Sequence, residues 1–258
     1  MNVTLLKRDG QKEVINRINL DQMAGAIQGK MLEESVRELR GFYHLMKTQR
    51  LDDGQIATNW KGGIKLPRVC FAAEWVNRKG QRKMLNYNSL VVLEVNNLPN
   101  YEKAVEIREL AKKLPETLMC FLGGSGKSVK IVCRGELFDG GLPEGDESIQ
   151  QFHLNIYNTA RRAYQNQFGF DIEFLEPRLD RTVYVSADPE MGFNPEARPF
   201  YADTERHDLP QPVAITDEED HLMPGRTITR TYQLNWSFIV DQVLGRYFDL
   251  PDEEREAK

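Results

Sequence analysis

Cysteine is scarce in this sequence, and long apolar runs are missing. The 258 residues contain three cysteines, Cys70, Cys120 and Cys133, and no CxxC pair. An odd set without paired spacing argues against a disulfide framework and against a zinc module. No apolar run approaches the roughly 20 residues of a membrane-spanning helix, and the opening MNVTLLKRDGQKEV becomes charged too early for a signal peptide. We therefore expect a soluble, cytoplasmic protein.

Net positive charge is also lacking, which at first argues against a nucleic-acid partner. The formal net charge is -5, whereas phosphate binding draws on clustered lysines and arginines. The acids are concentrated, however: residues 202–220 carry seven of them against one base, so the rest of the chain has a net charge of +1. The sequence thus predicts a mildly basic body with an acidic appendage.

The same compositional change predicts the domain organisation. We expect one α/β domain with an amino-terminal helical cap over 1–201, because this length can bury a sizeable core. An acidic, proline-bearing linker or arm follows over 202–228. Residues 229–258 are expected to form a helical extension, since the apolar stretch 234–248 is too rich in large side chains to remain in water.

Hydrophobic periodicity predicts an alternation of helices and strands. Asn100 is suited to begin a helix as its N-cap, and Gly169 is suited to end one. A glycine-containing turn, NRKGQRK, predicts a hairpin. The predicted helices lie in 18–50, 100–114 and 147–167, and the predicted strands lie in 65–76, 89–98, 118–122, 129–133 and 181–187.

The segment FLGGSGKSVK is the most informative for function, because it joins two short apolar strands through a glycine-rich turn. Its glycines let the backbone approach a ligand, and its lysines and serines offer cations and hydroxyls, a combination that suits phosphate. It is not a P-loop, since Phe121 holds the place of the first glycine and a strand follows instead of a helix. The plain alternative is a glycine hairpin with solvated lysines. The predicted phosphate-binding residues are Ser125, Gly126, Lys127, Ser128 and Lys130.

Polar side chains at the ends of two predicted strands form a second candidate site. Glu94 and Asn96 close one strand on the same face, and Asp188 follows another. Oxygen ligands of this kind can coordinate a divalent ion. The alternative is that each acid caps a turn.

A third candidate is the basic turn of the predicted hairpin. Its cations can grip phosphates of a nucleic-acid backbone, although most charge runs are solvated faces. The residues are Arg78, Lys79, Arg82 and Lys83.

The succession KLPRVCFAAEW, YNSLVVLEVNNL, FLGGSGKSVKIVCR and LDRTVYVSADPEMGFNPEA resembles the primase-like amino-terminal domain of virulence-associated protein E. That domain belongs to the archaeo-eukaryotic primase superfamily, and the resemblance covers residues 60–200. It implies an α+β fold with an α/β half, an RRM-like half built on an antiparallel sheet, and a site in the cleft between them.

The resemblance also implies roles for the candidate residues. Glu94, Asn96 and Asp188 take the places of metal ligands, and Lys130 stands where active primases have a histidine. With Glu94, Lys130 and Asp188 as catalytic residues, the implied chemistry is nucleotidyl transfer assisted by Mg²⁺ or Mn²⁺. Asn96 replaces an acid, so the first motif is degenerate and holds a second ion less strongly.

Two functional hypotheses follow from these residues. The first is a primase-like protein of DNA replication or mobile-element maintenance, which binds nucleotide and single-stranded DNA or RNA and works with a separate helicase. The second is a non-catalytic module that keeps the primase fold and mediates protein interaction. Asn96 and the net acidity favour the second.

Overall fold

The computed structural model describes residues 1–9, 12–48, 66–78 and 81–205. The chain divides into two compact units, Met1–Arg206 and His207–Lys258, and the description below concerns the first. The elements are β1 (Asn2–Asp9), β2 (Lys12–Asn19), α1 (Leu20–Gln28), α2 (Glu33–Thr48), β3 (Arg68–Cys70), β4 (Ala73–Arg78), β5 (Gln81–Tyr87), β6 (Leu90–Val95), α4 (Tyr101–Ala111), β7 (Thr117–Leu122), β8 (Val129–Leu137), α5 (Asp146–Phe168), β9 (Val183–Tyr184), β10 (Gly192–Phe193) and β11 (Phe200–Ala202).

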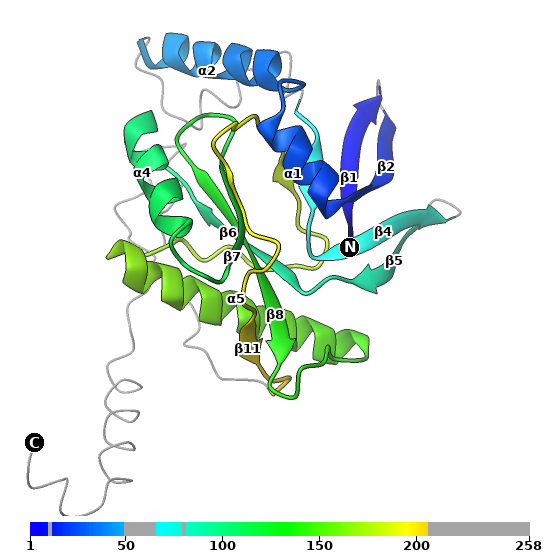
Figure 1. Cartoon of the computed structure of the whole chain (residues 1–258). Helices are drawn as coiled ribbons and strands as arrows, with labels where there is room; N and C mark the ends of the chain where they lie inside the picture. Colours follow the sequence, from blue (N-terminus) through cyan, green and yellow to red (C-terminus); the bar gives the residue numbers. More distant parts are fainter. Residues whose placement is uncertain (10–11, 49–65, 79–80, 206–258) are drawn as a thin grey trace, which may run out of the picture. The chain divides into compact units, whose positions relative to one another are not determined.

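A mixed sheet around β8 forms the centre of this unit (Figure 1). Strands β6 and β7 pair with β8 from its two sides, both antiparallel, and β10 continues the sheet beyond β7. The short β11 runs parallel to the far end of β8. The predicted strand pair around the glycine turn is confirmed as the β7–β8 hairpin.

A second, antiparallel sheet has the order β2-β1-β3-β9, and β4 pairs with β5 as a separate hairpin. The predicted strand 65–76 is wrong as a single element, because it divides into β3 and β4, which belong to different sheets. The predicted strand 181–187 is reduced to β9. The amide of Val185 still donates to the carbonyl of Pro67 in the β3–β9 register, but Pro67 has no N–H to donate, so the paired ladder ends there. Strands β1 and β2 had no sequence-based prediction.

Two helix ends lie where the sequence indicated a cap. Asn100 caps α4 as predicted, since its side chain accepts from the amide of Lys103 at 2.8 Å. Gly169 ends α5 as predicted, in a left-handed conformation with φ of 74°. The predicted helical region 18–50 contains α1 and α2.

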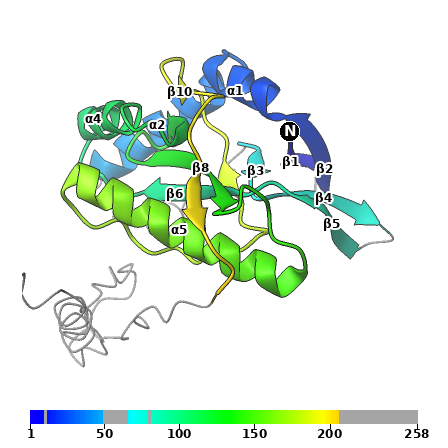
Figure 2. The ribbon, with the colours of Figure 1, turned by 60° about the horizontal axis from the view of Figure 1, so that its bottom comes forward.

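The central sheet is covered on both faces, and its side chains alternate between them. One face packs on α4 and α5 through a core that includes Leu93 and Ile131. The other face packs on α1 and the second sheet through residues such as Phe121 and Val132. Figure 2 shows α5 lying along the first of these faces. The expected α+β class with antiparallel sheets is therefore confirmed.

Some sequence-based predictions fall outside the described residues. These are Lys79, all but the first four residues of the acidic segment 202–228, and the extension 229–258. Within the described part of the chain, no helix combines the length and the hydropathy needed to cross a membrane.

Candidate functional site: a cation-rich cluster beside the glycine turn

Glu94, Asn96 and Lys130 come together at the end of the β6–β8 pair, as the sequence indicated. Glu94 lies directly opposite Lys130 in the antiparallel register. Both side chains point to the face of the sheet opposite α4 and α5, because Leu93 and Ile131 occupy the helix-covered face. The Lys130 ammonium donates to Oε2 of Glu94 and, at 3.1 Å, to Oδ1 of Asn96.

Arg181 adds a second cation to the same carboxylate. Its Nη2 donates to Oε1 of Glu94 at 2.6 Å, so each carboxylate oxygen of Glu94 faces a different cation. Burial raises the pKa of the Glu94 carboxyl, but the ion pairs with Lys130 and Arg181 outweigh burial and hold this pKa below its ordinary value. The cluster therefore contains two cations and one anion, a net charge of +1.

One buried donor of this cluster has no partner. Nε of Arg181 is buried and forms no hydrogen bond with any described residue. The backbone that carries Arg181 then passes over β8, because Asp188, seven residues later, binds the edge of β7. Ser186 lies on this crossing segment, fully buried, and its hydroxyl also lacks a partner among the described residues. Unsatisfied buried donors in a region of positive charge favour an anionic ligand.

The glycine turn, Gly123–Ser128, is tightly packed. The amide of Gly123 donates to the carbonyl of Ser128 at 2.8 Å, and a Cβ on Gly123 would overlap Oγ of Ser128. The carbonyl of Lys127 accepts from the amide of Leu98, which fixes the turn to the segment between β6 and α4. Gly126 has φ of 73°, a conformation that favours glycine. The turn is thus a rigid feature of the sheet end.

Asp188 lies apart from Glu94. Its Oδ1 accepts from Nη1 of Arg108 at 2.6 Å, and its Oδ2 accepts from the amide of Leu122 at 2.8 Å. Leu122 is on β7, and β8 separates β7 from β6. The sequence analysis placed Glu94, Asn96 and Asp188 in one crevice. The structure brings Glu94 and Asn96 together, whereas Asp188 has a different set of partners.

The predicted metal ligands do not fit a divalent ion in this arrangement. The Lys130 ammonium occupies the position between the Glu94 and Asn96 oxygens that a metal ion would take. Both Asp188 oxygens already accept hydrogen bonds. Among residues 1–9, 12–48, 66–78 and 81–205, no three His, Cys, Asp or Glu side chains gather as a metal site requires. The ammonium and guanidinium donors of the cluster are suited to an anion.

The basic turn predicted to contact nucleic acid lies on the β4–β5 hairpin. Arg78 and Lys83 are exposed. Arg82 is engaged with Glu13, which also pairs with Arg68. Arg78 and Lys83 are therefore the described cations of this turn that remain available to a phosphate.

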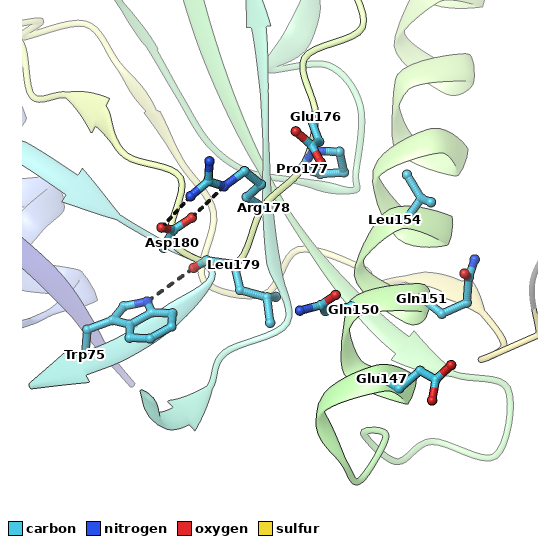
Figure 3. Close-up of a pocket in the computed structure, with 10 residues that line it drawn as sticks. All are labelled: Trp75, Glu147, Gln150, Gln151, Leu154, Glu176, Pro177, Arg178, Leu179 and Asp180. Atoms are coloured by element: carbon cyan, nitrogen blue, oxygen red, sulfur yellow. Dashed lines mark hydrogen bonds and ion pairs between the residues drawn. The ribbon is translucent and has the colours of Figure 1, made fainter. Parts of the chain in front are cut away.

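A pocket of about 480 Å³ opens elsewhere, between α5 and the segment 176–180 (Figure 3). Trp75 closes one side, and its indole Nε1 donates to the carbonyl of Leu179 at 3.2 Å. Arg178 is held by Asp180 through two hydrogen bonds. The other acids of the lining, Glu147 and Glu176, make the pocket net negative, so it does not suit a phosphate.

Arg181 and Arg108 were not assigned roles by sequence reasoning. A signal for Arg181 was present, because it directly precedes the strand that leads to Ser186 and Asp188. Arg108 carried no such signal, since it stands among other charged residues of an amphipathic helix. Its burial is visible only in the folded chain, where its side chain is 1% exposed.

Comparison with known protein families shows the family of this chain. The family model described as BT4734-like, N-terminal domain, matches residues 63–193. The chain belongs to this family. The BT4734-like match includes β3 to β10 and thus the Glu94 cluster, the glycine turn and Asp188. Searches of curated proteins and of solved structures return no significant match.

Proposed function

We propose that this BT4734-like domain binds the phosphates of a nucleotide or of single-stranded nucleic acid at the Glu94 cluster and the glycine turn. The observation that carries the proposal is the surplus of cations: Lys130 and Arg181 share one carboxylate, and Nε of Arg181 is buried without a partner among the described residues. A phosphate oxygen would satisfy that donor and balance the charge.

The surroundings of the cluster support the same ligand class. Phe121 on β7 lies opposite Lys130, and the turn Gly123–Ser128 begins two residues after Phe121. The turn therefore brings Lys127 and two serine hydroxyls to this end of the sheet. Arg181 is about one third exposed, so a ligand can reach it from solvent.

The resemblance to virulence-associated protein E supplies the biological part of the proposal. It suggests a primase-like protein of DNA replication or mobile-element maintenance, acting beside a separate helicase. Binding is favoured over nucleotidyl transfer, because Lys130 stands between the oxygens that would hold a metal ion. Incubation with template, nucleotides and Mg²⁺ or Mn²⁺ tests the catalytic alternative. Primer synthesis would show that the Lys130 ammonium leaves its position between the Glu94 and Asn96 oxygens when a metal ion binds.

The non-catalytic interaction module is the second candidate function. An exposed aromatic stack on the sheet favours it: the rings of Phe138 and Tyr201 lie 6.1 Å apart and nearly parallel. Phe138 is 73% exposed, and adjacent exposed aromatic rings are suited to contact a protein partner. The two candidate functions use different surfaces, so a substitution of Arg181 should affect phosphate binding and leave a protein interaction at Phe138 and Tyr201 unchanged.

Arg181→Ala is the test of the proposed phosphate site. Glu94 keeps its ion pair with Lys130 in this variant, so the sheet end retains a paired carboxylate. We expect affinity for a labelled oligonucleotide or nucleotide to fall by about tenfold or more at low salt, the size of a lost charge-assisted hydrogen bond. Fluorescence anisotropy measures this directly.

Arg178→Ala is the matched control. Arg178 lies three residues earlier on the same segment, is largely exposed and pairs with Asp180. Its removal changes the net charge by the same amount but leaves the cluster intact, so affinity should stay within about twofold. Equal affinities of the wild type and Arg181→Ala would remove the basis of the proposed function.

A further inference from the structure

Arg40, on α2, carries the largest set of unpaired buried donors in the described part of the chain. Its Nε and Nη2 are both buried, and neither forms a hydrogen bond with a described residue. Arg40 has no acidic partner among these residues either. Contact with the ring of Tyr101 compensates only part of the hydration that such a guanidinium loses, which favours an anion that supplies the missing acceptors.

Arg40 lies against the glycine turn. A Cβ placed on Gly126 would come within 3.3 Å of Nε of Arg40 and within 3.1 Å of the ring of Tyr101. The guanidinium also lies over the Tyr101 ring, 5.4 Å from its centroid. Figure 1 shows α2 beside the turn that joins β7 and β8. Leu39 on the same helix also packs on this turn, since a Cβ added to Gly124 would contact its side chain.

Two sources of positive potential lie at the contact between Arg40 and the glycine turn. Tyr101 is the first residue of α4, so the positive end of that helix lies next to the guanidinium. Lys127 follows Gly126 on the turn. The nearest acids in sequence are Glu38 on α2 and, beside Tyr101, Glu102 in the first turn of α4, and both are exposed. Tyr101 is 45% exposed, so solvent reaches the ring over which the guanidinium lies.

We infer that Arg40 forms a second phosphate anchor, separate from the Glu94 cluster, and that the ligand is a single-stranded polynucleotide that passes over the glycine turn. This inference rests on the proposed function. Gly126, which Arg40 contacts, and Lys130 are four residues apart, and even a fully extended chain of this length spans no more than about 13 Å, which sets the upper limit on the separation of their backbones. A polynucleotide presents consecutive phosphates over such a length, whereas a mononucleotide satisfies one anchor.

Arg40→Ala tests this inference against two ligands, a twelve-residue oligothymidylate and a nucleoside monophosphate. We expect oligonucleotide affinity to fall by about tenfold and the slope of log affinity against log salt to decrease by about 0.7, the value of one single-strand phosphate contact. Affinity for the monophosphate should stay within about twofold. Arg40→Lys should recover part of the loss, because it keeps the charge.

Arg37→Ala is the control, because Arg37 lies one helical turn earlier on α2 and is exposed. Thermal melts of all variants establish that they fold. If Arg181→Ala weakens oligonucleotide binding and Arg40→Ala does not, the second anchor is wrong and the proposed function stands. If Arg40→Ala weakens both ligands equally, the two arginines serve one phosphate and the polynucleotide inference is wrong. If the wild type binds neither ligand, the proposed function itself fails.

Discussion

Replacing Asp188 by alanine should destabilise the protein strongly, because this carboxylate compensates a buried guanidinium. Arg108 is 1% exposed and Asp188 is 3% exposed, and their charged atoms lie 2.6 Å apart. Removal of one partner of a buried ion pair costs about 3 to 5 kcal/mol, since the other charge stays buried. Arg108 keeps its contacts with Glu109 and Glu190, which places the expected loss near the lower end of that range.

Asp188→Asn removes the charge and keeps one of the two acceptors. The amide oxygen of asparagine can still accept from the amide of Leu122, whereas its amide nitrogen cannot accept from Arg108, so the ion pair and that hydrogen bond are lost together. We expect a loss of about 2 kcal/mol in the free energy of unfolding. Urea unfolding followed by circular dichroism measures both variants by linear extrapolation.

Asp180→Asn is the control, because Asp180 pairs with Arg178 at the surface and should cost less than about 0.5 kcal/mol. A stability of Asp188→Ala within about 0.5 kcal/mol of the wild type would refute the assignment of Asp188 to a structural ion pair. The metal-ligand alternative makes a different prediction: Mn²⁺ would raise the melting temperature of the wild type and leave Asp188→Asn unchanged.

Two further predictions concern packing and pH. Gly135→Ala should lower the free energy of unfolding by about 1 to 3 kcal/mol, because a Cβ at this position would lie 2.6 to 2.8 Å from three carbons of Ile156. An additional Ile156→Val change should recover part of the loss. A urea unfolding curve equal to that of the wild type would contradict the tight packing. Burial lowers the pKa of His153 to about 4, so below the ordinary pKa of about 6.5 the unfolded chain binds a proton that the folded chain does not. The free energy of unfolding should therefore fall by up to about 1.4 kcal/mol per pH unit from pH 6.5 towards pH 4. Unfolding curves measured at pH 7 and pH 5 should show a smaller difference for His153→Gln than for the wild type. An equal difference in the two proteins would argue against a neutral buried imidazole.

The sequence by itself determined most of the local structure. Apolar runs flanked by glycine or proline located β6, β7 and β8, and helical spacing located α1, α2, α4 and α5, because these patterns reflect burial on one or two faces of a single element. The caps at Asn100 and Gly169 were also readable, since their hydrogen bonds involve residues within one helical turn.

Only the tertiary structure decided how distant side chains share their charges. Arg181 lies 87 positions after Glu94, and Asp188 lies 80 positions after Arg108, yet each pair forms a direct ion pair. No periodicity within either segment encodes such a contact, because it depends on how segment 181–188 crosses the sheet. The same crossing separates Asp188 from Glu94 and leaves Arg181 with a spare donor. Whether a carboxylate faces a metal or an arginine is therefore settled by packing between elements, not by the residue type at a strand end.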